Sequence, residues 1–259
     1  MNEQFLSMLI VGTFVGGIAG YLGSVMVLKR MALVGDALGH IALPGMGLAL
    51  LFGLDVSLGA FAFLLASVFL IWLLELKTSL PAEALVGVVF VASLALGFLL
   101  VPEPELLHSL IGNISNVGFF GAIVSVSLAV IVFAVIRSVR NDLILSGISP
   151  DIARAQGVNI KTQNLIYLIS IAAITAVGIK ITGTLLVGAL VVIPAAASKN
   201  ISRNLKEYLF LSVLFGIFSS ILGIIVFKTY NLPVGPMIVL VSVVIFVFSL
   251  VFKNFRKAV

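Results

Sequence analysis

The sequence predicts an all-α integral membrane protein, a polytopic bundle of about nine transmembrane helices, with eight as the other possible count. Of its 259 residues, 61% are hydrophobic and only 10% are charged, whereas soluble domains carry about 25% charged residues. The charges lie in short segments between long uncharged runs. Segments of about ten residues with alternating polarity, which would indicate a transmembrane barrel, are absent from the sequence.

Nine runs approach or exceed the roughly 17–25 residues that cross a bilayer as a helix. In chain order they are 4–28, 31–54, 56–74, 84–102, 106–136, 162–179, 181–198, 208–227 and 229–252. Asp36 is the only charge inside them. The sixth and seventh runs are short and closely joined, which leaves eight helices as an alternative. Basic residues follow the first run but do not precede it, so we expect a retained helix there and not a secretion signal.

The connections between the runs are short, with two exceptions. The stretch 101–118 begins with two prolines and two glutamates and is expected on the outer side. The stretch 137–161 is the longest segment outside the runs. Within it, Ser149 is predicted to cap a short amphipathic helix over about 150–157, with Pro150 at its first position and a glycine near its end.

Charge distribution predicts the orientation. If the N-terminus is outside and the C-terminus inside, the inner connections contain thirteen of the fifteen basic residues, and the outer ones contain only Lys180 and Lys228. This agrees with the excess of Lys and Arg in cytoplasmic loops of membrane proteins. The same bias explains the basic composition, so nucleic-acid binding is not needed to account for it.

Two absences from the sequence narrow the chemistry. The chain has no cysteine, so it offers neither disulfides nor thiolate ligands for a metal. It also lacks the Gly-x4-Gly-Lys-Ser/Thr loop that binds nucleotide phosphates. Any ATP-driven work must therefore come from another subunit.

Asp36 and His40 are the most informative pair of residues, because ionisable groups inside a spanning helix usually mark a transport path. Their i, i+4 spacing places both side chains on one helix face, with the Cβ atoms about 5–6 Å apart. A carboxylate and a neutral imidazole in this arrangement are able to bind a divalent metal ion. Structural pairing of the two groups and a proton relay are the alternatives.

Glycine and proline residues surround this pair. Gly39 and Gly45 flank the Asp36/His40 face and are predicted either to leave room for an ion or to pack closely against other helices. Pro44, one turn beyond the histidine, and Pro194, inside the seventh run, each remove a helix hydrogen bond and are expected to bend the backbone. Ordinary membrane-helix packing is the alternative for all four.

Four stretches of the sequence resemble, in order, the metal-type ABC transporter permeases, the ABC-3 group that imports zinc, manganese or iron(II). RMALVGDALGHIALPG (30–45) is the most specific and is similar to the second-helix signature of that group. AEALVGVVFVASLALGFLL (82–100), LHSLIGNI (107–114) and TGTLLVGALVVIPAAAS (182–198) are similar to later segments. The resemblance extends over nearly the whole chain.

The resemblance implies a single permease domain, 1–259, in a bacterial or archaeal cytoplasmic (inner) membrane, acting as a transport subunit and not as an enzyme. Its expected partners are a second permease copy, an ABC ATPase subunit and an external metal-binding protein. Manganese, zinc or iron would be carried, not kept as a cofactor. Asp36 and His40 would hold the ion transiently. Two ligands do not complete a four-coordinate site, so either a two-fold homodimer brings two such pairs together, or each protomer holds its own ion and water or other residues complete the shell.

A motif for docking to the ATPase has a similar form in the segment 137–161. Permeases of this type carry an acidic residue, two alanines and, after three further residues, a glycine. Here Asp151, Ala153 and Gly157 match, with isoleucine in place of the first alanine. Arg154 would reach an acidic partner. A plain amphipathic connector is the alternative.

His108, Glu103 and Glu105 in the outer stretch are candidates to receive metal from the binding protein, although solvated loop residues of this kind often have no such role. Two other classes of function stay open. A secondary metal transporter would need no ATPase. An intramembrane metalloenzyme would need a fuller ligand set such as His-Glu-x-x-His, which the sequence lacks.

Overall fold

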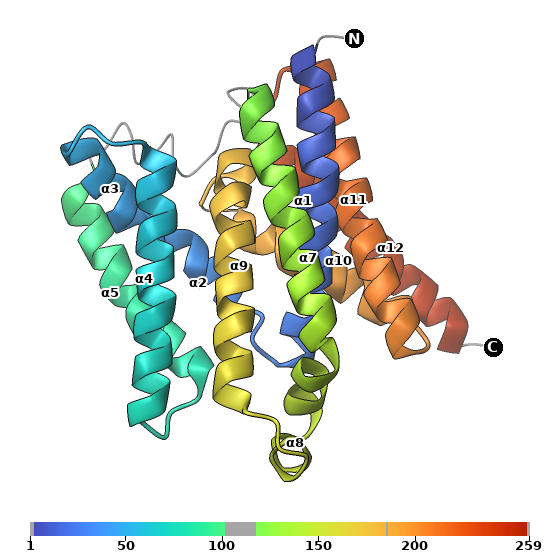
Figure 1. The fold of residues 1–259 in the computed structure, drawn as a ribbon. Coiled ribbons are helices and arrows are strands. Elements are labelled where there is room, and N and C mark those ends of the chain that lie inside the picture. Colours follow the sequence, from blue (N-terminus) through green and yellow to red (C-terminus); the bar gives the residue numbers. More distant parts are fainter. Residues whose placement is uncertain (1–2, 102–117, 185, 258–259) are drawn as a thin grey trace.

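A computed structural model describes residues 3–101, 118–184 and 186–257, and within them every regular element is a helix (Figure 1). The helices are α1 (Glu3–Leu28), α2 (Val34–Ile41), α3 (Leu43–Leu51), α4 (Val56–Lys77), α5 (Ala82–Leu100), α7 (Phe119–Ile148), α8 (Pro150–Ala155), α9 (Ile160–Thr182), α10 (Val187–Ile201), α11 (Leu205–Tyr230) and α12 (Val234–Lys257). The all-α class predicted from the sequence is confirmed.

Eight segments of the described chain are long and apolar enough to cross a membrane, with α2 and α3 together forming one of them. The predicted run 181–198 does not form a ninth span of full length. It gives α10, whose 15 residues extend about 22 Å at 1.5 Å per residue, less than the ~30 Å hydrocarbon layer. The run is divided because Gly183 has a φ of +83° and ends α9. Within the described residues, the alternative count of eight spans is therefore the one observed.

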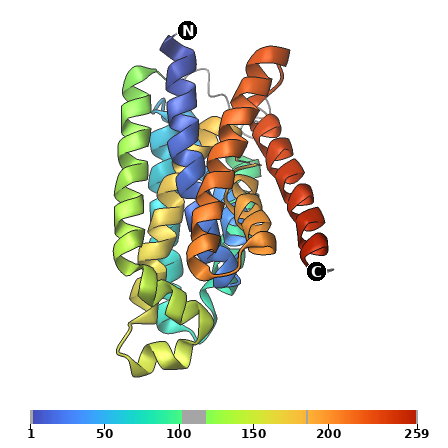
Figure 2. The same cartoon turned by 90° about the vertical axis from the view of Figure 1, so that its right-hand side faces the viewer.

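Helix α7 continues beyond the run that predicted it. It ends at Ile148, so residues 137–148 are helical, although the sequence placed them in a connection. The arginines of this segment end the hydrophobic run but do not end the helix, because Arg is a good helix former. As a result, α8 follows directly from a long rigid helix and lies at the lower tip of the molecule in Figures 1 and 2.

Helix α1 packs against α7, α10 and α11. Figure 1 shows α3, α4 and α5 at one edge and α11 and α12 at the other. Gly16 and Gly20 of α1 face Gly216 and the Ser212 carbonyl of α11 so closely that added Cβ atoms would overlap backbone. These glycines serve close helix packing, as expected inside membranes. By contrast, large apolar side chains such as Leu99 are exposed on the outside, where lipid would surround them.

The second span is divided into α2 and α3 at Ala42. Pro44 explains the division, because it lacks the N–H that would bond to the carbonyl of His40. A break in the helix is thus present beside this proline, while Ala42 keeps helical backbone angles, so the bend itself stays a prediction. Pro194 lies inside α10 without ending it. In Figure 1, α2 lies near mid-height of the bundle, between α9 and the group of α3, α4 and α5.

Candidate functional site

Helix α2 is held in the bundle by most of its surface. Of its eight residues, Val34, Gly35, Ala37, Leu38, Gly39 and Ile41 are buried. Only Asp36 is exposed, and His40 is half-buried. Both lie on the same face because they are four residues apart. The sequence prediction that these two side chains share a face is therefore supported by the helical backbone between them.

Neither of the two side chains has a hydrogen bond or ion pair with another described residue. The Nδ1 atom of His40 is buried without a partner, and its ring lies 5.7 Å from the ring of Phe90, centre to centre. A buried nitrogen without a partner costs about 1–3 kcal/mol. The carboxylate of Asp36 is exposed on the surface of the single chain. The isolated chain thus leaves two potential ligand groups unsatisfied on one helix face.

The backbone of α2 is fixed by contacts with α10 and the turn before it. A Cβ atom on Gly188 would lie 2.6 Å from both the Cα and the N of Asp36, so α10 packs directly on the backbone of this residue. A Cβ atom on Gly39 would lie 2.5 Å from the carbonyl oxygen of Thr184 and 2.7 Å from Val187. These contacts bring the backbone of α2 directly against α10 and the turn before it.

The flanking glycines pack against neighbouring helices. Gly39 is in contact with the turn between α9 and α10, and a Cβ atom on Gly45 would overlap the Gly59 carbonyl and the Phe63 side chain of α4. Within this chain the space beside both glycines is filled. A role for them in an ion pathway stays a prediction, as it does for Pro44 and Pro194.

The described residues contain no cluster of three or more His, Cys, Asp or Glu side chains that could hold a metal. One chain therefore supplies Asp36 and His40 but no third ligand of these types within 3–101, 118–184 and 186–257. The candidates for metal delivery, Glu103, Glu105 and His108, lie outside the described residues.

Sequence reasoning missed Thr184 at the turn between α9 and α10. Its side chain is fully buried, and its Oγ1 has no hydrogen-bond partner. Its carbonyl contacts α2 at Gly39. The only sequence signal for it is the polar triplet Thr-Gly-Thr at the start of 182–198. Thr184 adds a polar group without a partner beside the helix that carries the candidate ligands.

The candidate docking element α8 is shorter than predicted, six residues instead of about eight. Ser149 is at the N-cap position and Pro150 at the start of the helix, as expected, but the side chain of Ser149 makes no capping hydrogen bond. Gly157 ends the turn with a φ of +80°, where its N–H bonds to the carbonyl of Arg154 at 3.0 Å. Ala153 is fully buried and anchors α8 on the bundle.

The charged residues of α8 are turned to solvent. Arg154 and Asp151 form an ion pair of 3.2 Å, with side chains 69% and 93% exposed. An exposed pair of this kind contributes at most about 1 kcal/mol. Ile152, the residue that replaces alanine in the motif, is also about half exposed. The helix therefore presents both charge and apolar surface away from the bundle.

Comparisons with known proteins agree with this architecture. Residues 1–253 match the ABC 3 transport family. The manganese transport system membrane protein MntC of Listeria monocytogenes is 29% identical over 97% of this chain and 92% of its own length. MntB of Synechocystis, also named as a manganese transport system membrane protein, is 31% identical over 97% of this chain and 84% of its own length.

A solved structure has the same fold as this chain. PsaBC from Streptococcus pneumoniae, in complex with Fab, contains a chain that superposes with a TM-score of 0.82 at 27% identity, covering 95% of this chain and 91% of that one. The family match extends over nearly the whole sequence, and the helices provide the spans that such a subunit requires. This chain therefore belongs to the ABC 3 transport family and is a multi-pass permease of a cell membrane, a transport subunit and not an enzyme.

Proposed function

We propose that this chain is the membrane-spanning subunit of an ATP-driven importer for a divalent transition metal, with manganese as the first candidate and zinc or iron(II) as the others. One observation carries the proposal: α2 presents an exposed carboxylate, Asp36, and a buried, unpaired imidazole nitrogen, His40 Nδ1, on one face at mid-height of the bundle. A travelling cation would satisfy both groups.

The chemistry of the two groups supports a cation as the guest. The carboxylate offers negative charge, and a neutral imidazole offers a nitrogen lone pair. Because the chain supplies two ligands, a second copy related by a two-fold axis would complete a site with two oxygen and two nitrogen ligands. The exposed side of Asp36 is available for such a pairing. We infer that the ion is held weakly enough to leave, since tight binding would prevent its release.

Manganese is favoured by the names of the relatives, and the ligand types are compatible with it. Carboxylate and imidazole ligands without sulfur also accept iron(II) and zinc. Affinity at such a site follows the order that places zinc above manganese. Selection of manganese would then come from the external binding protein and from the geometry of the site, not from the ligand types.

The energy source of the proposed importer is a separate ATPase, for which α8 is the docking element. The exposed Asp151 and Arg154 and the apolar surface of Ile152 give α8 the features of a small interface. Its position beyond the ends of the spans, at the same end as most basic residues, supports a cytoplasmic location. The N-terminus then lies outside, on the side where a metal-binding protein would deliver its cargo.

The test is uptake of radioactive Mn²⁺ by proteoliposomes that contain the permease with its ATPase subunit and binding protein, in the presence and absence of ATP. We expect ATP-dependent uptake that falls on the order of 100-fold in Asp36→Asn and in His40→Ala. Excess Zn²⁺ or Fe²⁺ as competitor identifies the preferred cargo. Normal uptake in both variants would overturn the assignment of the site.

A matched control is Asp55→Asn. Asp55 is also a carboxylate near a helix end, but it caps α4 by accepting hydrogen bonds from Ser57 and Leu58 at 2.9 and 3.0 Å, and asparagine caps equally well. This variant should transport like the wild type. Uptake that persists without the ATPase subunit and follows a proton gradient would support the secondary transporter instead.

A further inference from the structure

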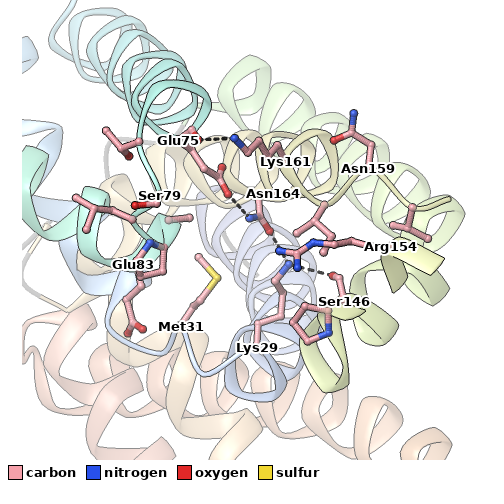
Figure 3. Close-up of a pocket in the computed structure, with 17 residues that line it drawn as sticks. Lys29, Met31, Glu75, Ser79, Glu83, Ser146, Arg154, Asn159, Lys161 and Asn164 are labelled. Atoms are coloured by element: carbon pink, nitrogen blue, oxygen red, sulfur yellow. Dashed lines mark hydrogen bonds between the residues drawn. The ribbon is translucent and has the colours of Figure 1, made fainter. Parts of the chain in front are cut away.

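A network of polar side chains joins four helices at the same end of the bundle as α8. Lys29, directly after α1, donates hydrogen bonds to Oδ1 of Asn164 in α9 at 2.6 Å and to Oγ of Ser146 in α7 at 3.3 Å. Asn164 donates to Oε1 of Glu75 in α4 at 2.7 Å. Lys161 donates to the carbonyl of Glu75 at 2.7 Å. Figure 3 shows these side chains converging.

On one side, the network reaches the base of the docking element. Ser146 lies four residues before α8 begins, and it is buried. A Cβ atom on Gly147 would lie 2.9 Å from Cγ of Lys29, so the lysine stem packs against this last turn of α7. Any displacement of α8 that tilts the end of α7 must therefore displace Lys29.

On the other side, the network reaches the helix of the candidate ligands. The residues from Lys29 to Leu33 join α1 to α2, and Arg30 among them has a φ of +59°, a conformation that costs energy outside glycine. Met31 N–H bonds to the carbonyl of Met26 at 2.9 Å, which keeps the turn tight. This short, tightly turned connection is the direct covalent link between Lys29 and α2.

Space for such movement is present. A pocket of about 780 Å³ adjoins the network and is lined by residues from α4, α5, α7, α8 and α9, among them Glu75 and Arg154, and by Lys29 from the connection after α1. The second carboxylate oxygen of Glu75 is buried without a partner. The network therefore has an unused acceptor to which a shifted donor could bond, which is the requirement for two alternative arrangements.

We propose that Lys29 is a positioning residue that transmits the movement of α8 to α2, through its hydrogen bonds to Ser146 and Asn164. The inference rests on the proposed function, in which α8 docks to the ATPase and α2 carries the metal ligands. Lys29 touches neither metal nor nucleotide. It joins the two elements so that ATP hydrolysis changes the exposure of the metal site.

The state of the Lys29 ammonium makes the inference testable by pH. Burial lowers the pKa of Lys29 to about 8 from its usual 10.5, and the carboxylate of Glu75 opposes this shift. Two other titratable groups near it come from α9. Lys161 bonds to the carbonyl of Glu75, and the ring centre of Tyr167 lies 5.9 Å from Nζ of Lys29. Glu83 of α5 and Arg154 of α8 line the same pocket.

The experiment uses the complete complex in proteoliposomes. The ATPase faces the bath, and the lumen contains the binding protein and Mn²⁺ at pH 7. The quantity measured is Mn²⁺ transported per ATP hydrolysed while the bath pH rises from 7 to 9. In the wild type we expect this ratio to fall about tenfold, following loss of the ammonium charge at a pKa of about 8. Lys29→Arg, which keeps its charge throughout, should remove that pH dependence.

A second comparison is made at pH 7. Lys29→Met should lower the ratio by about fivefold or more, the lower range of coupling between sites, while ATP hydrolysis continues. Lys77→Met is the matched control, because Lys77 is an exposed lysine at the same end of the bundle and should leave the ratio unchanged.

The possible failures are distinguishable. A wild-type complex without ATP-dependent Mn²⁺ transport would overturn the proposed function itself. A wild-type complex that transports Mn²⁺ at a constant ratio from pH 7 to pH 9 would overturn the role of Lys29 alone. If Lys29→Met fails to assemble, the wild-type and Lys29→Arg pH profiles still decide the question.

Discussion

Gly188→Ala tests whether the packing of α10 on Asp36 positions the metal site. The added Cβ would lie 2.6 Å from the Cα and N of Asp36, and ordinary contact begins at 3.4 Å, so the two backbones must separate by about 0.8 Å. Neither contacting atom belongs to a side chain that could rotate away. Overpacking of this kind costs about 1–3 kcal/mol of stability, and displacement of a functional group by about 1 Å costs on the order of 100-fold in rate.

The assay is ATP-dependent Mn²⁺ uptake by reconstituted complexes, normalised to the amount of assembled permease, together with thermal unfolding in detergent. We expect Gly188→Ala to lower uptake by about 10- to 100-fold, with a loss of stability of no more than about 3 kcal/mol. Gly87→Ala on α5 is the control, because nothing lies within 4 Å of its added Cβ. Wild-type uptake by a folded Gly188→Ala permease would refute the reasoning that α10 fixes the position of Asp36.

Three further outcomes follow from the described contacts. Asn204→Ala should cost about 0.5–2 kcal/mol of stability, because the side chain of Asn204 caps α11 by accepting a backbone hydrogen bond of 2.9 Å. Ser149→Ala removes no such bond and should change the stability by less than about 0.5 kcal/mol. Both values are measured by unfolding in detergent. As the pH rises from about 8 to 10.5, the free energy of unfolding of the wild type should rise relative to that of Lys29→Met. The folded state, with its lowered lysine pKa, binds fewer protons there than the unfolded chain; an unchanged difference in pH-dependent unfolding would contradict this. Asp151→Asn should leave the melting temperature almost unchanged, because its ion pair is exposed, yet lower the ATPase activity that co-purifies with the permease.

Much of the architecture followed from local composition. A bilayer has no water to satisfy backbone polar groups, so each long apolar run had to become a helix. The spacing of Asp36 and His40 was enough to place them on one face, because four residues span about one helical turn. The break at Pro44 followed from the missing N–H of proline. In each case the physical cause acts within a few residues of the chain.

Only the tertiary structure revealed that α10 rests on the backbone of Asp36 and that Lys29 bonds to Ser146 and Asn164, 117 and 135 residues away. It also showed that the His40 nitrogen lacks a partner. Hydropathy gives each helix its length but says little about which helix lies beside it, since lipid and apolar side chains are nearly equivalent surroundings. Neighbours inside the membrane are selected by shape and by single polar groups, and these act between residues that are distant in the sequence.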